Sequence, residues 1–179
     1  FSPAFSGFIP DILVLSADSP PLETRSTNDG SDWAELPSAG VSPFSTTGGP
    51  TQVIWNPTYS YWCAARSSVA NKTSVSSDNA ASWTDSGVLS YPIEWMAHND
   101  SGLIAGLARG GGNNPGTTTD GLNWTFNGSA VPLADNGMTP IVWCDSLGLF
   151  VFTKNYNINP AGGNDTRSWT SPDGLNYTV

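Results

Sequence analysis

The chain has 179 residues, which fits a single domain, and it carries 15 acidic residues against 6 basic ones. Its formal net charge of −9 excludes a nucleic-acid binder that neutralises phosphates with a basic face, and it argues against docking on an anionic membrane. No run of apolar residues approaches the roughly 18 that would span a bilayer. With 19 Gly, 14 Pro and 8 Trp, the composition favours short strands joined by turns, so we predict an all-β protein.

One turn pattern occurs four times along the chain, at residues 26–33, 76–83, 117–124 and 170–177. Its shared form is a hydroxyl residue, any residue, a small polar residue, Asp or Asn, Gly or Ala, any residue, a polar residue and an aromatic residue. The Asp or Asn closes the turn on its own backbone, the Gly accepts positive φ, and the aromatic residue starts the returning strand. We assign to this pattern Asn28, Asp29, Gly30 and Trp33, then Asp78 and Trp83, then Asp120, Gly121 and Trp124, and finally Asp173, Gly174 and Tyr177.

A second repeated unit precedes the last three turns and reads Val53-Ile54-Trp55, Ile93-Glu94-Trp95 and Ile141-Val142-Trp143. A short turn and a second strand follow each copy, at residues 59–65, 103–108 and 149–153. In the first unit only the second strand is clear, at residues 12–17, and residues 5–9 or another segment supply the inner strand. Four antiparallel strands in about 45 residues make one propeller blade. We therefore predict one β-propeller domain of four blades, at residues 1–40, 41–90, 91–132 and 133–179.

The eight-residue turn resembles the Asp-box, the bacterial-neuraminidase repeat Ser-x-Asp-x-Gly-x-x-Trp. The first two copies fit it best, while the last two place the acid at the fourth position, at Asp120 and Asp173. The resemblance implies a propeller with its boxes at the periphery of the blades, away from the ligand face. Sialidases, other glycosidases, sorting receptors, photosystem assembly factors and phage virion proteins all carry such repeats, so the fold leaves the function open.

A sialidase activity is not expected from these residues. Sialidases hold their substrate with three arginines, the first in a Phe-Arg-Ile-Pro motif, and the nearest string here, residues 8–10, lacks the arginine. Arg25 and Arg167 lie just before boxes, and the glutamates Glu23, Glu35 and Glu94 have no convincing Tyr partner. We predict that the chain is not an enzyme. The alternative is a carbohydrate-active hydrolase that uses two of the aspartates as a carboxylate pair.

Basic residues recur where the second strand of a blade ends. Aligning these strands puts Arg66, Arg109 and Lys154 at one position, with Asp18 there in the first unit. In Asp-box propellers this strand end opens onto the ligand face, so the cations suit a carboxylate, sulfate or phosphate on a glycan. Trp62 lies outside the repeat and would stack on a sugar ring, as would Trp169. The alternative is that each cation neutralises aspartates in its own loop.

The remaining reactive or modifiable residues are few. Cys63 and Cys144 fall in different blades, and we expect free buried thiols, while His98 is expected in a solvated turn. One His and two Cys exclude a zinc cluster, and no cofactor is expected. Six Asn-x-Ser/Thr sequences permit glycosylation, two of them (Asn123 and Asn176) as by-products of the turn pattern. The other four candidate sites are Asn71, Asn99, Asn127 and Asn164.

Taken with the resemblance, this composition implies an extracellular or virion protein of the tail-fibre type, with a structural or attachment role. It would bind glycans on its loop face and associate with itself or with other structural subunits, without nucleic acid or membrane insertion. The four blades close by themselves, or further blades come from another chain or a further stretch of sequence. Unclosed blades would leave apolar faces and strand edges open to association.

Overall fold

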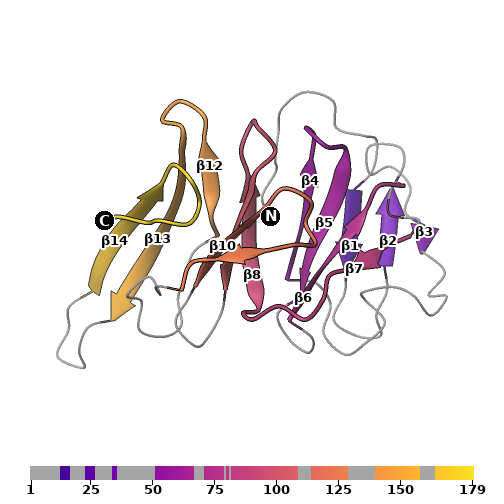
Figure 1. Ribbon diagram of the computed structural model, residues 1–179, viewed down its shortest axis with the longest axis horizontal. Coiled ribbons are helices and arrows are strands. Elements are labelled where there is room, and N and C mark those ends of the chain that lie inside the picture. The colour runs from indigo at the N-terminus through magenta and orange to yellow at the C-terminus, as the bar shows by residue number, and fades with distance from the viewer. Residues whose placement is uncertain are drawn as a thin grey trace.

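The computed structural model describes residues 13–16, 23–26, 34–35, 51–66, 71–78, 80, 82–108, 114–128, 140–157 and 164–179. These residues form four antiparallel sheets, in which every strand pairs with its neighbour in sequence, and no helix occurs among them (Figure 1). The prediction of an all-β fold is confirmed. The first sheet holds β1 (Leu13–Ser16), β2 (Glu23–Ser26) and β3 (Ala34–Glu35), and the second holds β4 (Gln52–Asn56), β5 (Tyr61–Arg66), β6 (Lys72–Ser76) and β7 (Thr84–Asp85). The third holds β8 (Ile93–His98), β9 (Ile104–Ala108), β10 (Pro115–Thr118) and β11 (Thr125–Phe126), and the fourth holds β12 (Val142–Cys144), β13 (Leu149–Asn157) and β14 (Asn164–Ser171).

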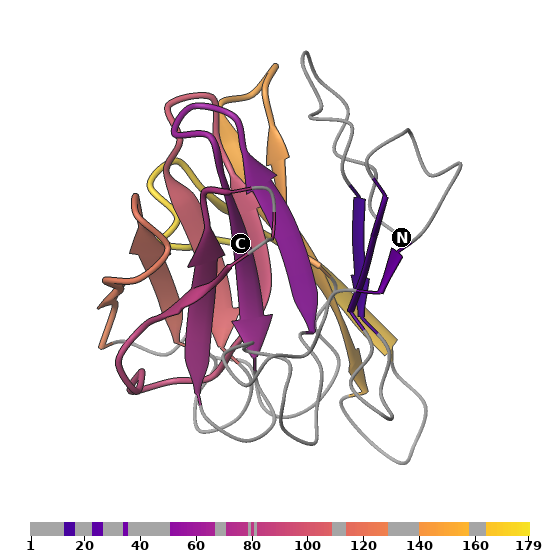
Figure 2. The ribbon, with the colours of Figure 1, turned by 90° about the vertical axis from the view of Figure 1, so that its right-hand side faces the viewer.

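The second and third sheets have all four strands in the predicted order of strand, tight turn, strand, long loop, strand, Asp-type turn, strand, and the first and fourth sheets have three described strands each. The outer strands are short, and in the fourth sheet the outer strand is reduced to one bridge between Thr170 and Thr178. The first strand expected at residues 5–9 lies outside the described residues. In each of the last three sheets the first three strands alternate in direction, which Figures 1 and 2 show from two sides.

Apolar side chains fill the spaces between neighbouring sheets. One cluster joins the second and third sheets and includes Cys63, Met96 and Ile104, all at most 1% exposed. Another joins the third and fourth sheets through Leu107 and Phe150. A third cluster, around Trp62 and Trp83, covers the face of the second sheet that is turned away from the third. Alternation along each strand therefore gives every inner sheet two buried faces.

The repeated Ile-x-Trp unit does not point the same way in every sheet. Strand β8 has a register irregularity between Ile93 and Trp95. As a result Trp95 packs against the fourth sheet, whereas Trp143 packs against the third, the sheet that precedes its own. Trp55 also lies on the side facing the preceding sheet. One bulge thus reverses the face of one tryptophan, because side chains alternate with a period of two residues.

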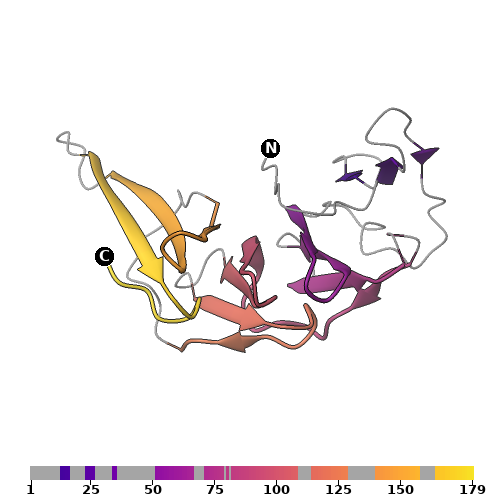
Figure 3. The same cartoon turned by 90° about the horizontal axis from the view of Figure 1, so that it is seen from above.

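Seen from above, the four sheets follow an open arc (Figure 3). The first and fourth sheets lie at its two ends, and the second and third form its middle. The spacing of the turn pattern along the chain predicted four units. The four described sheets do not form a closed ring. The turns between the first two strands of the last three sheets lie along the upper edge in Figure 1, and the far ends of β5 and β13 point to the lower edge.

Candidate ligand-binding edge

The third turn is held by a single carboxylate. Asp120 Oδ1 accepts hydrogen bonds from the backbone N–H groups of Leu122 (2.9 Å) and Asn123 (2.8 Å), and its Oδ2 accepts one from Asn123 Nδ2 (2.7 Å). The Thr118 hydroxyl donates to Asp120 Oδ1 and accepts from the backbone N–H of Gly121 at 3.0 Å. These bonds satisfy the donors that the tight turn exposes, so the segment is a self-contained structural turn.

The fourth turn repeats this network atom for atom. Asp173 accepts from the backbone of Leu175 and from the backbone and side chain of Asn176, and the Ser171 hydroxyl accepts from Gly174 N–H at 2.9 Å. The second turn is one residue longer. There Asp78 accepts from the backbone N–H and hydroxyl of Ser82, and the Ser76 hydroxyl accepts from Ala80 N–H.

These bonds correct the alignment of the last two copies. The sequence comparison started them at Thr117 and Thr170, with the acid in the fourth position. The hydroxyls that close the turns are those of Thr118 and Ser171, so the acid keeps the third position in both. The box is seven residues long there, because the residue between acid and glycine is missing. The first copy, with Trp33, lies outside the described residues.

The same hydrogen bonds set the pKa values of the carboxyls. Hydrogen bonds from Ser82, led by its hydroxyl, lower the pKa of Asp78 to about 2. Burial acts to raise the pKa of Asp120, but bonds from the backbone and side chain of Asn123 outweigh it and lower the pKa to about 2. Burial and hydrogen bonds oppose each other in the same way at Asp173, whose pKa is also lowered. All three carboxylates are therefore ionised at neutral pH, and their negative charge is stabilised by hydrogen-bond donors of the turn itself.

The turns also join neighbouring sheets. Thr73 of the second sheet donates through Oγ1 to the carbonyl of Gly121 (2.5 Å) and accepts from Trp124 Nε1 (2.9 Å). A Cβ added to Gly121 would lie 2.5 Å from Val75 Cγ2 of the second sheet. A Cβ on Gly174 would likewise meet the Ala105 side chain of the third sheet. Glycine at these two positions allows each turn to approach the side chains of the preceding sheet, and the turns thereby hold neighbouring sheets together.

Of the three basic residues expected at one position of the second strand, two stand at equivalent positions of the pairing register. The hydroxyl residue of each box gives a common reference point, because it pairs with one residue of the second strand. Ser76 pairs with Trp62, Thr118 with Ile104 and Ser171 with Phe150. Four residues further along the second strand stand Arg66 and Lys154 in the second and fourth sheets, but Ala108 in the third. Arg109 is one residue beyond this position and lies outside the described residues, as does Asp18. The sequence comparison aligned the ends of the second strands and so missed this one-residue offset, which appears when the position is counted from the box hydroxyl.

The register adds two cations that the sequence comparison did not assign to the site. Arg66 stands directly opposite Lys72, and Lys154 stands directly opposite Arg167. Four of the six basic residues of the chain thus form two like-charged pairs at equivalent positions of two sheets. We call these four residues the basic edge. The missed signal was the basic residue four positions before the box hydroxyl in the second and fourth sheets, Lys72 before Ser76 and Arg167 before Ser171, which gains meaning only from the pairing register.

The basic edge and the boxes lie at opposite ends of the strands. Along β5, Arg66 is four residues from Trp62, the partner of the box hydroxyl, which is about 13 Å of extended chain. In the second sheet the pair stands at the far end of β5, whereas in the fourth sheet β13 continues for three residues beyond Lys154. One carboxylate accompanies the pair in the second sheet, because Lys72 Nζ lies 3.4 Å from Asp85 Oδ2. In the fourth sheet, Asp165 stands two residues before Arg167 on the same strand.

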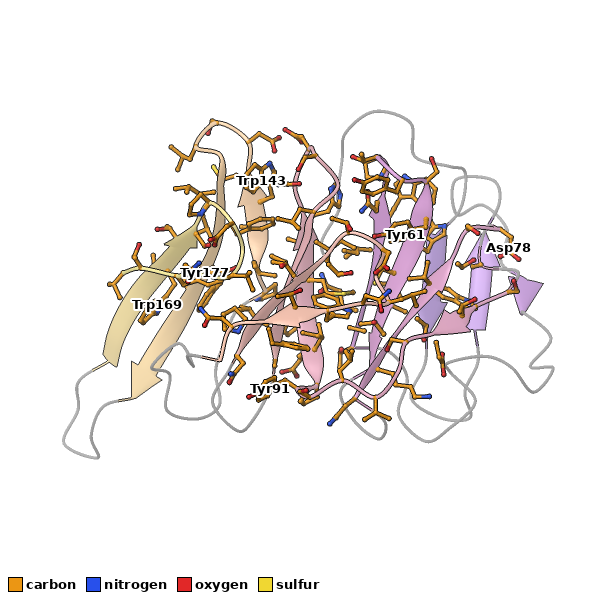
Figure 4. All side chains as sticks on the ribbon, in the orientation of Figure 1. Tyr61, Asp78, Tyr91, Trp143, Trp169 and Tyr177 are labelled. Carbon is orange, nitrogen blue, oxygen red and sulfur yellow. The ribbon has the colours of Figure 1, made fainter. Side chains whose placement is uncertain are left out.

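The proposed stacking role of Trp62 and Trp169 is wrong. Both side chains are only 6% exposed. Trp62 packs on Trp55, with ring centroids 5.2 Å apart, and Trp169 stacks on Phe152 in the cluster between the third and fourth sheets. Figure 4 shows Trp169 beside Tyr177 in the fourth sheet. Their positions on the alternating buried faces leave no ring surface for a sugar, and their absence from the repeat reflects different packing in each sheet.

The glycosylation candidates are not equivalent. Asn127 Nδ2 donates to the Leu175 carbonyl (3.0 Å) and to Asn176 Oδ1 (3.1 Å), so a glycan on this nitrogen would disturb a contact between the third and fourth sheets. Asn99 uses its Oδ1 to close a turn, and Asn71 has a positive φ of 44°. Asn164 begins β14, and its side chain lies outside the described residues.

The other reactive groups form no recognisable centre. Cys63 is buried and free, as predicted, and Cys144 is free but only partly buried. His98 ends β8 and is half-buried, so it does not lie in a solvated turn. Among the described residues, no group of His, Cys, Asp or Glu side chains is arranged to hold a metal ion. In the same part of the chain, no helix has the length and apolar character needed to cross a membrane.

Comparison with solved structures decides the fold. A GH74 xyloglucanase from Xanthomonas campestris superposes with a TM-score of 0.65 at 15% identity, over 94% of this chain and 28% of that one. The fold is a sialidase-like β-propeller. YCF48 bound to a D1 peptide matches with a TM-score of 0.56 at 14% identity, over 94% of this chain and 48% of that one. The NanB sialidase of Streptococcus pneumoniae matches with a TM-score of 0.53 at 14% identity, over 88% of this chain and 28% of that one.

The chain spans about a quarter to a half of the length of these propellers. No protein-family model matches it, and no curated protein matches it in sequence. At these identities the likeness concerns the fold, and each sheet described above corresponds to a blade of that fold.

Proposed function

We propose that this chain is a non-enzymatic attachment propeller, outside the cell or on a virion surface, that binds an acidic glycan at its basic edge. The observation that carries the proposal is the pair of like-charged positions, Arg66 opposite Lys72 and Lys154 opposite Arg167, in a chain of net charge −9. The four residues of the basic edge stand on the second and third strands, toward the connection between them, and such connecting segments commonly carry binding residues.

Like charges directly opposite each other on a sheet destabilise it, so a structural role does not account for the pairs. An anion placed between the two cations converts that repulsion into two charge-assisted hydrogen bonds. An arginine in each pair suits a carboxylate or sulfate, which its planar guanidinium can hold through two N–H groups. In the second blade Lys72 already has Asp85 as a partner, so the proposal assigns the main contact with the anion there to Arg66.

The similar structures support a binding role without fixing it. A xyloglucanase and a sialidase share the fold, and both are named for carbohydrates. YCF48 was solved with a bound peptide, so the same architecture also serves recognition of a partner. The present chain resembles all three only in fold, so the proposal rests on the basic edge and not on the likeness.

The test measures binding to polygalacturonate, dextran sulfate and neutral dextran by calorimetry at physiological ionic strength. We expect the two anionic glycans to bind and neutral dextran not to bind. Arg66→Gln combined with Lys154→Gln should weaken binding at least about tenfold, since each lost charged contact is worth about 1.5–3 kcal/mol before solvent screening reduces it. Arg25→Gln, which removes a cation from β2 outside the pairs, is the matched control. Equal binding by the double variant and the control would contradict the proposal.

The alternative is a carbohydrate-active hydrolase, which the likeness to two glycosidases favours. The same three glycans, incubated with the protein, separate the two functions. An attachment protein leaves the number of reducing ends unchanged. Release of reducing ends above the level seen with heat-unfolded protein would favour the hydrolase and contradict the attachment role.

A further inference from the structure

An aromatic ring stands in the connection between the second and third blades. Figure 4 shows Tyr91 there, at the lower edge of the molecule. The side chain of Tyr91 is half-buried, and its ring meets that of Phe126 on β11 edge to face, with the centroids 5.2 Å apart. Among the described residues, none forms a hydrogen bond with the Tyr91 hydroxyl. Packing against the third blade therefore holds the ring, and part of the side chain stays open to solvent.

A backbone hydrogen bond places this tyrosine beside the basic pair of the second blade. Beyond β7 the chain continues along β6, and the N–H of Leu89 donates to the carbonyl of Asn71 at 2.7 Å. Asn71 directly precedes Lys72, which stands opposite Arg66 in the basic pair. Tyr91 follows Leu89 by two residues, which is about 7 Å of extended chain. The ring is therefore within reach of a ligand that the basic pair holds.

The same tyrosine stands next to the position at which the third blade lacks a cation. Ala108 takes the place that Arg66 and Lys154 hold in the second and fourth sheets. Ala108 pairs with Ile93, and Tyr91 precedes Ile93 by two residues. In the order of the blades, an aromatic ring thus stands between the two basic pairs.

We infer that Tyr91 stacks on a sugar ring of the bound glycan, and that the basic edge thereby selects an acidic glycan over an anion without sugar rings. The C–H face of a sugar ring is apolar, and a tyrosine offers it an apolar ring with a polar tip. Tyr91 is already packed on Phe126, so little side-chain freedom is lost when a sugar covers it. The tyrosine takes the stacking role that the buried Trp62 and Trp169 cannot fill. This inference rests on the proposed function, because the cations hold the ligand that the ring contacts.

The test compares an oligogalacturonate with polyglutamate, which carries carboxylates but no sugar rings. Calorimetry should show that Tyr91→Ala weakens binding of the oligogalacturonate about tenfold, the effect of leaving one apolar sugar face in water. Binding of polyglutamate should change by less than about twofold. Tyr91→Phe keeps the ring and should bind both ligands as the wild type does. Equal weakening of both ligands by Tyr91→Ala, or unchanged binding of the oligogalacturonate, would overturn the inference.

The matched control is Tyr59→Ala. Tyr59 is 51% exposed and lies in the turn between β4 and β5, at the other end of the strands from the basic pair, so its loss should alter neither affinity. Failure of the proposed function gives a different result, because the wild type would then bind neither ligand, or Arg66→Gln with Lys154→Gln would bind both unchanged. Loss of both ligands in that double variant, with none in Tyr91→Ala, would leave the basic edge as the site and overturn only the stacking.

A second measurement needs no variant and so does not depend on how Tyr91→Ala folds. In the wild-type complex with the oligogalacturonate, the ring protons of Tyr91 should show nuclear Overhauser effects to the C–H protons of a sugar, and the ring current should move those sugar signals upfield. Sugar signals that bind without either effect would overturn the inference.

Discussion

At the scale of single residues, the boxes differ at the position of positive φ. Gly121 and Gly174 both have φ of 71°, but the second box places Ala80 there, with φ of 61°. A side chain in the left-handed region costs about 1–2 kcal/mol. Ala80→Gly should therefore raise the free energy of unfolding by about 1 kcal/mol or slightly less, since glycine also loses more chain entropy on folding. Urea unfolding measures the change, and a clear loss of stability would contradict the strain.

The converse substitution tests the close approach of the third box. Gly121→Ala introduces both the left-handed penalty and a Cβ that collides with Val75, so we expect a loss of at least about 2 kcal/mol in urea unfolding. Gly87→Ala is the matched control, because a Cβ there meets nothing within 4 Å. The control should be neutral or slightly stabilising. Similar losses in both variants would mean that the box does not press on the neighbouring blade.

The box carboxyls predict how stability depends on pH. The pKa values of Asp78 and Asp120 are about 2 in the folded protein, below the ordinary value of 3.8. A depressed folded pKa contributes stability that is complete above the ordinary value and is lost as the pH falls toward the folded value. The urea midpoint should thus change little from neutral pH to about pH 5 and fall between about pH 4 and pH 2. Asp120→Asn should be less stable at neutral pH and show a shallower fall. Equal midpoints at neutral pH and near pH 2 would contradict the assignment.

At the scale of elements, the contact between blades rests on a few buried polar groups. Thr73→Val removes the hydroxyl that bonds the carbonyl of Gly121 and the indole N–H of Trp124. Leaving buried partners unsatisfied costs about 1–3 kcal/mol each, and the remaining Gly121–Trp124 bond offsets part of it. We expect a loss of about 2–4 kcal/mol in urea unfolding. Thr84→Val, at an exposed position on β7, should change the free energy of unfolding by no more than about 0.5 kcal/mol. An equal loss in both variants would contradict the role of the Thr73 hydroxyl between the blades.

The elements also show where reading the sequence succeeds and where it fails. The strands around Trp55, Trp95 and Trp143 were predictable, because turn residues and alternating apolar residues mark them on both sides. Three features could not be predicted: the sheet face on which Trp95 lies, the one-residue offset of Arg109, and the seven-residue length of the last two boxes. All three errors are displacements by one residue: a bulge for Trp95, a missing turn residue for the boxes, and an alignment on strand ends rather than on the pairing register for Arg109. One residue is enough to exchange the two faces of a strand. The burial of Trp62 belongs to the same class, because it depends on which face packs against a neighbour.

At the scale of the whole molecule, the repeat predicted the number and order of the units but not their closure. Each unit encodes its own strands and turns, whereas ring closure depends on the small rotation between neighbouring blades and on what covers the end faces. The four described sheets follow an open arc, with the face of Val142 at one end. The boxes bond neighbouring blades to each other, and the proposed binding site lies farther along the same strands.

The measurement that tests the account most directly maps a bound anionic oligosaccharide on the protein by backbone amide NMR shifts. Titration with an oligogalacturonate should shift the amides of Arg66, Lys72, Lys154 and Arg167, which lie at the lower ends of the second and fourth blades. The amides of the box residues Asp120 and Asp173 should stay unchanged and serve as internal controls. Shifts gathered on the box side, or none at oligosaccharide concentrations well above the protein concentration, would contradict the claim that the basic edge is the ligand-binding side of this propeller.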